Sequence, residues 1–189
     1  EFGLMLYPGP SGSGAQGVEG TVDACRVNQQ DDVCTPQRPR CTTGEVVVDV
    51  ALNTEQSIQD AMIWPDALSH SYTPTWQSIE AASQYQPLIQ DTQDNYAILL
   101  TDGWQCCGVY NNGTRCEAEP RSLPVDKIRE LKEAGVTPFV IGFGGSVDVT
   151  TLQRMAIEAG TAKAGCDPEA TDINSPLLCY YQASEPQTL

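Results

Sequence analysis

Asp102 is the acidic residue whose position most favours chemistry, because it directly follows the apolar run Tyr-Ala-Ile-Leu-Leu-Thr at residues 96–101. A run without polar alternation predicts a strand that is buried on both faces, in the middle of a parallel sheet covered by helices. In open α/β sheets, ligands bind beyond the carboxyl ends of such strands, which is where Asp102 stands. The alternative is that Asp102 and Gly103 simply form a good turn. This stretch alone leaves both interpretations open.

The eight cysteines are the second chemical feature of the sequence. Their even number and their position in Gly- and Pro-rich segments favour disulfides and an oxidising compartment. A zinc site is disfavoured, because there is no Cys-x-x-Cys pair and the single histidine, His70, is far from every cysteine in sequence. The expected bridges are Cys166 with Cys179, Cys116 with Cys106 or Cys107, one pair within Cys25, Cys34 and Cys41, and one bridge from that group to Cys106 or Cys107.

Composition restricts the partners of the chain. Its 189 residues are 40% hydrophobic and 19% charged, which is typical of one globular domain. The formal net charge is -15, from 25 acidic residues against 10 Lys and Arg. Such a surface repels nucleic acid and anionic membranes and suits cations and basic partners, although simple solubility explains most of the charge. No apolar run reaches about 18 residues, so no membrane span is expected. No signal peptide is present, so we expect a secreted chain that has lost its N-terminus or a fragment.

The chain alternates between strand and helix patterns. Strands are predicted at residues 2–7, 45–51, 96–101, 136–143 and 178–183, and the first two can pair as a wide antiparallel hairpin. Helices are predicted after an Asn53 cap, over residues 76–83, from Ser122 to Gly135 and from Asp148 to Gly160. This alternation predicts one α/β domain over residues 1–189 with a largely parallel sheet. Cys-rich insertions tied by disulfides are expected at about 9–44 and 104–121.

Four segments, in order, resemble von Willebrand factor type A domains. Ile98–Gly103 resembles the fourth-strand signature of that family, and Tyr72–Thr75 resembles its second metal motif. Phe139–Gly145 with the helix after it resembles the fifth strand and last helix, and Tyr180–Ala183 resembles the closing strand. The match covers most of the chain outside the Cys-rich loops. The resemblance implies an open, doubly wound, mostly parallel sheet with helices on both faces.

The resemblance also implies a metal-ion-dependent adhesion site. In the family, a hard divalent cation is held by oxygen ligands, and an acidic residue of a protein partner takes the open position. Thr73 and Asp102 match two of those ligands here, so the implied cofactor is Mg²⁺ or Ca²⁺. The alternative for Thr73 is a helix N-cap before Pro74. The two side chains are expected to lie close together at the carboxyl edge of the sheet.

One part of the family pattern is missing from this sequence. No Asp-x-Ser-x-Ser motif occurs, and Ser11-Gly12-Ser13 has Gly9 where the aspartate is needed. Phe2–Tyr7 resembles the second strand of the family, so the first strand and first helix are absent. We therefore expect a strand from outside residues 1–189 to lie in the sheet between residues 2–7 and 96–101 and to pair with both. Its source would be an N-terminal part of the same protein, a second polypeptide or a neighbouring subunit.

Two functions follow from the resemblance. The first is a secreted adhesion or protein-binding module, extracellular, periplasmic or on the cell surface, with a divalent-cation site completed by the missing segment. The second is a structural subunit of an extracellular assembly without a working metal site. An enzyme is not expected, because the sequence contains no nucleophile elbow, phosphate loop or His-based catalytic pair.

Overall fold

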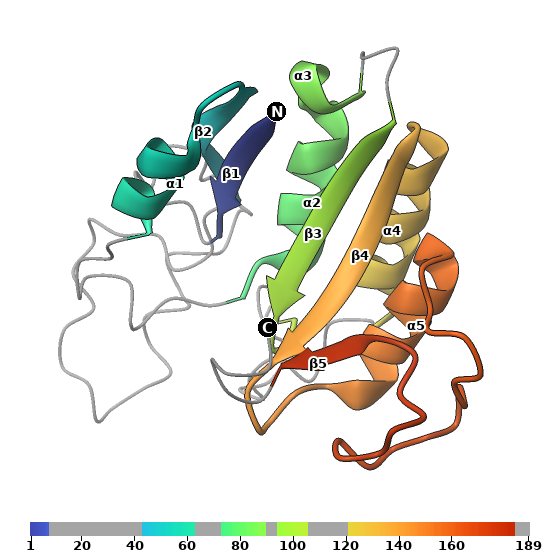
Figure 1. Cartoon of the computed structure of the whole chain (residues 1–189). Helices are drawn as coiled ribbons and strands as arrows, with labels where there is room; N and C mark the ends of the chain where they lie inside the picture. Colours follow the sequence, from blue (N-terminus) through green and yellow to red (C-terminus); the bar gives the residue numbers. More distant parts are fainter. Residues whose placement is uncertain (8–42, 63–72, 90–93, 106–120, 184–189) are drawn as a thin grey trace, which may run out of the picture. The chain divides into compact units, whose positions relative to one another are not determined.

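The computed structural model describes residues 1–7, 43–62, 73–89, 94–105 and 121–183 (Figure 1). Its elements are β1 (Phe2–Leu6), β2 (Glu45–Ala51), α1 (Glu55–Ala61), α2 (Thr75–Gln84), α3 (Gln86–Ile89), β3 (Asn95–Thr101), α4 (Ser122–Glu133), β4 (Val136–Phe143), α5 (Val149–Ala159) and β5 (Tyr181–Ala183). The chain forms two compact units. Unit 1 comprises Glu1–Ala81 and Gln105–Glu119, and unit 2 comprises Ala82–Trp104 and Pro120–Leu189.

Unit 1 contains the predicted antiparallel hairpin. Strand β1 pairs with β2 in a register that runs from Phe2 opposite Ala51 to Leu6 opposite Glu45. The hydroxyl of Thr54 donates to the carbonyl of Phe2 at 2.8 Å and so joins the start of β1 to the start of α1. The predicted Asn53 cap is wrong: the N-cap residue of α1 is Thr54, and Asn53 adopts a left-handed turn with φ 58°. The Thr54 hydroxyl donates to strand carbonyls, and no side chain forms a cap bond to this helix.

Unit 2 contains a parallel sheet in the order β3-β4-β5. The register of β3 and β4 runs without a break from Asn95 opposite Val136 to Thr101 opposite Gly142. Helices α4 and α5 lie behind these strands in Figure 1, and both contact β4. Their apolar stripes bury one face of the sheet, because α4 and α5 follow β3 and β4 as successive crossovers. The core includes Ile128, Leu131, Val136, Val140, Leu152, Met155 and Ala156.

The opposite face of this sheet is open. Tyr96, Ile98 and Leu100 of β3 are 59%, 70% and 47% exposed, whereas the residues between them are only partly exposed. The prediction that residues 96–101 form a strand buried on both faces is therefore wrong. The apolar run has no alternation in sequence, but the structure imposes one, because the helices that contact β3 and β4 leave these three side chains exposed.

Several ends of elements follow their sequence signals in unit 2. The Asp148 carboxylate accepts from the backbone N–H of Thr151 and caps α5, which ends at Gly160 with φ 79°. These two predictions are confirmed. Strand β4 has the predicted bounds, and β5 is shorter than predicted. Ser122 is the first helical residue of α4 rather than its cap, and no side chain caps that helix.

A disulfide closes the segment between α5 and β5. Cys166 is bonded to Cys179, as predicted, with a Cα–Cα distance of 4.9 Å. Buried Gln153 of α5 holds the same segment, since its amide nitrogen donates to the carbonyls of Asp167, Pro168 and Ala170 at 2.8–3.1 Å. Its side-chain oxygen accepts the backbone N–H of Cys179. The segment is thus fixed to the helix by both a covalent bond and a buried amide.

The described residues therefore form a mixed α/β structure with a three-stranded parallel sheet, helices and one disulfide-tied loop. The predicted insertions at about 9–44 and 104–121 lie almost entirely outside the described residues. The predicted bridges of Cys25, Cys34, Cys41, Cys106, Cys107 and Cys116 lie outside them as well.

Candidate functional site

Asp102 directly follows β3 at the carboxyl end of the parallel sheet. It is exposed, and its Oδ1 accepts the backbone N–H of Trp104 at 3.2 Å. The turn is tight at Gly103, which has φ 79° and donates its N–H to the hydroxyl of Thr101 at 3.1 Å. A Cβ on Gly103 would lie 2.9 Å from Cγ of Leu152. The turn therefore requires glycine, and it fixes the direction of the Asp102 side chain.

Partial burial and a backbone hydrogen bond act in opposite directions on the Asp102 carboxyl. The loops around it displace part of its water and raise the pKa of its carboxyl above the usual value, while the hydrogen bond from the Trp104 N–H opposes that rise. The residue is exposed overall, so the carboxylate remains accessible. None of the ion pairs among the described residues includes Asp102. An accessible carboxylate that has lost part of its hydration gains from a cation brought by a ligand or a partner.

The loop after β4 is joined to the Asp102 loop. The indole nitrogen of Trp104 donates to the carbonyl of Ser146 at 2.8 Å, and the backbone N–H of Asp148 donates to the carbonyl of Asp102 at 3.0 Å. The carboxyl ends of neighbouring parallel strands meet at one edge of a sheet, so both loops lie there. Together they form one edge surface, which we define as Asp102, Trp104, Ser146, Asp148 and Arg121.

Arg121 and Asp148 form the second charged feature of this edge surface. The guanidinium Nε of Arg121 lies 3.2 Å from Oδ2 of Asp148, and the Arg121 Cζ lies 5.3 Å from the centroid of a Trp104 ring. The Asp148 carboxylate is buried and also accepts from the Thr151 hydroxyl at 2.7 Å. Its oxygens are thus already satisfied by the helix cap and by Arg121. Asp102 is the carboxylate of this surface that remains open to a ligand.

Two polar groups close to β5 are buried near this edge. No hydrogen-bond partner is present in the described structure for the Tyr180 hydroxyl or for Oε1 of Gln182. Burial, and secondarily the negative charge of Asp148, raises the pKa of Tyr180 to about 12, so the hydroxyl keeps its proton at neutral pH. Gly142 makes room for both side chains, because a Cβ there would lie 2.5 Å from Cε2 of Tyr180.

The described residues do not by themselves form a metal site. Within them, no group of three or more His, Cys, Asp or Glu side chains is placed to hold an ion. Asp148 is occupied by Arg121, which leaves Asp102 as a single carboxylate at the edge. Mg²⁺ and Ca²⁺ take six or more oxygen ligands, so a cation at Asp102 would need ligands from outside the described residues.

Thr73, the other predicted ligand, lies just before α2. It is half-buried, and its carbonyl accepts the backbone N–H of Thr75 at 2.9 Å. Thr73 belongs to unit 1 and Asp102 to unit 2, so their closeness stays a prediction. The expected strand between residues 2–7 and 96–101 also stays a prediction, because β1 and β3 belong to different units.

Sequence reasoning missed the partners of Asp102 at this edge. Trp104 and Arg121 were assigned only to the ends of a Cys-rich insertion, and Ser146 was given no role. The signal for Asp148 was visible as a helix cap, but no spacing in the sequence connects it to Arg121. The contact between Arg121 and Asp148 joins residues that are far apart in sequence, so local sequence patterns do not predict it.

Comparisons with known proteins do not identify a family for this chain. A scan against protein-family models finds no match, and a search of curated proteins finds none either. In the part of the chain that the structure describes, no helix is long and apolar enough to span a membrane.

Proposed function

We propose that this chain is a secreted protein-binding module of the von Willebrand factor type A kind, which binds its partner at the carboxyl edge of the β3-β4-β5 sheet. The observation that carries the proposal is the exposed carboxylate of Asp102, which directly follows a parallel strand at the carboxyl edge of the sheet. A doubly wound sheet, completed by a strand from outside this numbering, is part of the same proposal. The activity proposed is binding, not catalysis.

The proposed cation is Mg²⁺ or Ca²⁺, with Asp102 and Thr73 among its ligands. The sequence motifs around both residues support this assignment, and the Asp102 carboxylate is in no ion pair among the described residues. The remaining oxygen ligands would come from outside the described residues. An acidic side chain of a protein partner would then complete the coordination.

A secreted or cell-surface location is supported by the disulfide between Cys166 and Cys179. Stable disulfides form in oxidising compartments and are rare in the cytosol. The net charge of -15 also suits a module that meets cations and basic surfaces.

A second candidate function is a structural subunit of an extracellular assembly, without a working metal site. The open apolar face of β3 and β4 favours it, because such faces mark surfaces that another polypeptide covers. In that case Asp102 would contribute to the contact by charge alone.

A cation titration separates the two candidates. Calorimetric titration with Mg²⁺ and with Ca²⁺ of the protein together with the segment that supplies the missing strand is expected to give saturable binding. Outer-shell substitutions at metal sites cost about 10–100-fold, so loss of a ligand in Asp102→Asn should weaken binding by at least about tenfold. Glu133→Gln removes an equal charge from the exposed surface of α4 and should leave the affinity unchanged. No saturable binding, or equal binding by both variants, would overturn the metal assignment and favour the structural subunit.

A further inference from the structure

Arg121 is a partly exposed cation on the edge surface, directly before α4. Its side chain is 53% exposed, and its Nε lies 3.2 Å from Oδ2 of Asp148, whose side chain is 6% exposed. Its Cζ lies 5.3 Å from the centroid of a Trp104 ring, so a carboxylate and an aromatic ring both hold the guanidinium. Within the part of the chain that the structure describes, Arg121 forms no other hydrogen bond or ion pair.

The two partners of Arg121 are themselves fixed. Asp148 caps α5 and accepts from both the backbone N–H and the hydroxyl of Thr151, and the positive end of the helix dipole favours its charge. The indole N–H of Trp104 donates to the carbonyl of Ser146 at 2.8 Å and so fixes the ring. A guanidinium presents its N–H groups in a planar fork. Because Asp148 lies on the Nε side, the Nη1 and Nη2 end of the fork remains for a ligand.

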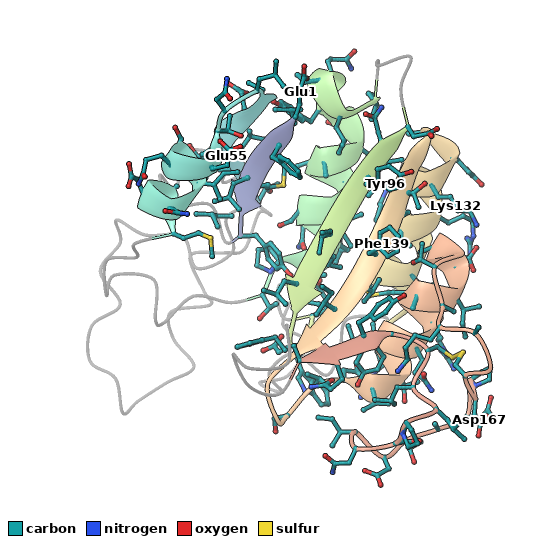
Figure 2. The ribbon with its side chains drawn as sticks, in the orientation of Figure 1. Glu1, Glu55, Tyr96, Lys132, Phe139 and Asp167 are labelled. Atoms are coloured by element: carbon teal, nitrogen blue, oxygen red, sulfur yellow. A yellow bond between two sulfur atoms is a disulfide. The ribbon has the colours of Figure 1, made fainter. Side chains whose placement is uncertain are left out.

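The basic side chains of α4 differ from Arg121, because they already have partners on the helices. Arg129 pairs with the carboxylate of Glu158. Lys132, labelled in Figure 2, lies near the C-terminal end of α4, and its Nζ donates to the carbonyl of Glu158 at 3.2 Å. Arg121 is instead placed on the edge surface, where the proposed partner binds.

We propose that Arg121 binds a side-chain carboxylate of the protein partner through the Nη1 and Nη2 end of its guanidinium. A guanidinium and a carboxylate match in geometry and form two parallel hydrogen bonds. This contact rests on the proposed function, since it is a second contact with the acidic partner that completes the cation site at Asp102. The partner then presents two acidic side chains, one to the cation and one to Arg121. Arg121 thereby selects among acidic partners.

A phosphate group is a poorer ligand for Arg121 than a carboxylate is. The formal net charge of -15 repels every anion, and it repels a doubly charged anion more strongly. Asp148 already offsets the charge of Arg121, so little excess positive charge remains for a dianion. A carboxylate carries a single charge and gains mainly from the geometry of the planar fork.

A nuclear magnetic resonance titration of the full chain tests this contact, with EDTA present so that no divalent cation contributes. The probe is N-acetyl-aspartate N-methylamide, which presents one side-chain carboxylate, and its neutral twin is the corresponding asparagine compound. The indole N–H signal of Trp104 and the Nε–H signal of Arg121 should shift with a Kd of roughly 1–10 mM, as expected for one bidentate pair. The twin should give no saturable shift at the same ionic strength.

Two variants assign the binding to the guanidinium fork. Arg121→Lys keeps the charge but loses the fork, so it should weaken binding of the probe at least about fivefold, as read from the Trp104 signal. Arg154→Lys supplies the matched control, because Arg154 is exposed on α5 and is outside the edge surface. It should leave the Kd of the probe unchanged.

Three results would overturn the proposal directly: no saturable shift, equal shifts with the neutral twin, or equal affinity of the Arg121→Lys variant and the native chain. Tighter binding of inorganic phosphate than of the aspartate probe would assign Arg121 to a phosphate ligand and overturn it as well. The calorimetric cation titration keeps the two proposals separate. A protein that binds the probe but no Mg²⁺ retains the Arg121 contact and loses the metal assignment, whereas one that binds Mg²⁺ but not the probe loses only the Arg121 contact.

Discussion

The two faces of the β3-β4-β5 sheet are both apolar, but they differ in what covers them. On one face, Val136 and Val140 are each 1% exposed beneath α4 and α5. On the other, Ile98 of the neighbouring strand is 70% exposed. Burial of either apolar face would lower the free energy of the protein. The connectivity of the chain determines which face its own helices cover. The covered face therefore stabilises the fold, whereas the exposed side chains of the open face contribute little to its stability.

The largest expected loss of stability comes from truncating a buried side chain on the covered face. Leu152 of α5 is fully buried and lies where Cβ atoms at Gly103 and Gly142 would be, so it packs directly against the backbone of β3 and β4. The two strands cannot easily move into the space that it would leave. Leu152→Ala should therefore lower the free energy of unfolding by about 4 kcal/mol. Urea denaturation of the full chain measures this value.

Ile98→Ala is the matched change on the open face. An exposed side chain loses little on truncation, so the free energy of unfolding should stay within about 0.5 kcal/mol of the native value. A loss comparable to that of Leu152→Ala would show that another part of the protein already covers the open face. The division between a stabilising face and a face that contributes little to stability would then be wrong.

The difference between the faces also marks what sequence patterns could predict. The bounds of β4 and the ends of α5 followed from local signals, such as the Asp148 cap and the left-handed Gly160. The hairpin of β1 and β2 and the bond between Cys166 and Cys179 were predicted as well. In each case the deciding interaction is short in sequence or depends on few alternatives.

The open face could not be predicted, because the run at residues 96–101 is mainly apolar on both sides of the strand. Its alternation depends on which face of the sheet the helices cover, and this is a property of topology. The contact of Arg121 with Asp148 was hidden for the same reason. Asp102 was found because a polar residue after an apolar strand is a local signal. Its environment depends on loops that meet only in the folded chain.

A smaller effect is expected where the covered face contains a polar group. Gln153 is 1% exposed, and its amide bonds to three carbonyls of the disulfide loop and to the Cys179 N–H. In Gln153→Ala these backbone groups lose their partner, so the free energy of unfolding should fall by roughly 2–3 kcal/mol. Hydrogen exchange of the Cys179 amide should become faster. Arg154→Ala, at the exposed neighbouring position, should change neither quantity; equal effects of both changes would show that Gln153 does not hold the loop.

The smallest effect on the free energy of unfolding is expected at Asp102, at the carboxyl edge of the sheet. Partial burial raises the folded-state pKa of this carboxyl. A group whose folded pKa lies above its unfolded value stabilises the fold below the unfolded pKa of about 3.9, and that contribution is lost as the pH rises through the folded pKa. Asp102→Asn should therefore match the native chain at pH 3 and be more stable at pH 7. The difference should be small, because the carboxylate is accessible to water.

Urea denaturation of both proteins between pH 3 and pH 7 measures this difference, with Glu133→Gln as the control for net charge. A variant that is less stable than the native chain at pH 7 would mean that the Asp102 carboxylate already has a favourable partner. Added Mg²⁺ sharpens the comparison. A cation held by Asp102 binds only the folded native chain, so it should raise the stability of that chain and leave the Asp102→Asn variant unchanged. The same cation should leave the stability difference between Ile98→Ala and the native chain unaltered, because the apolar side chains of the open face contribute no oxygen ligand.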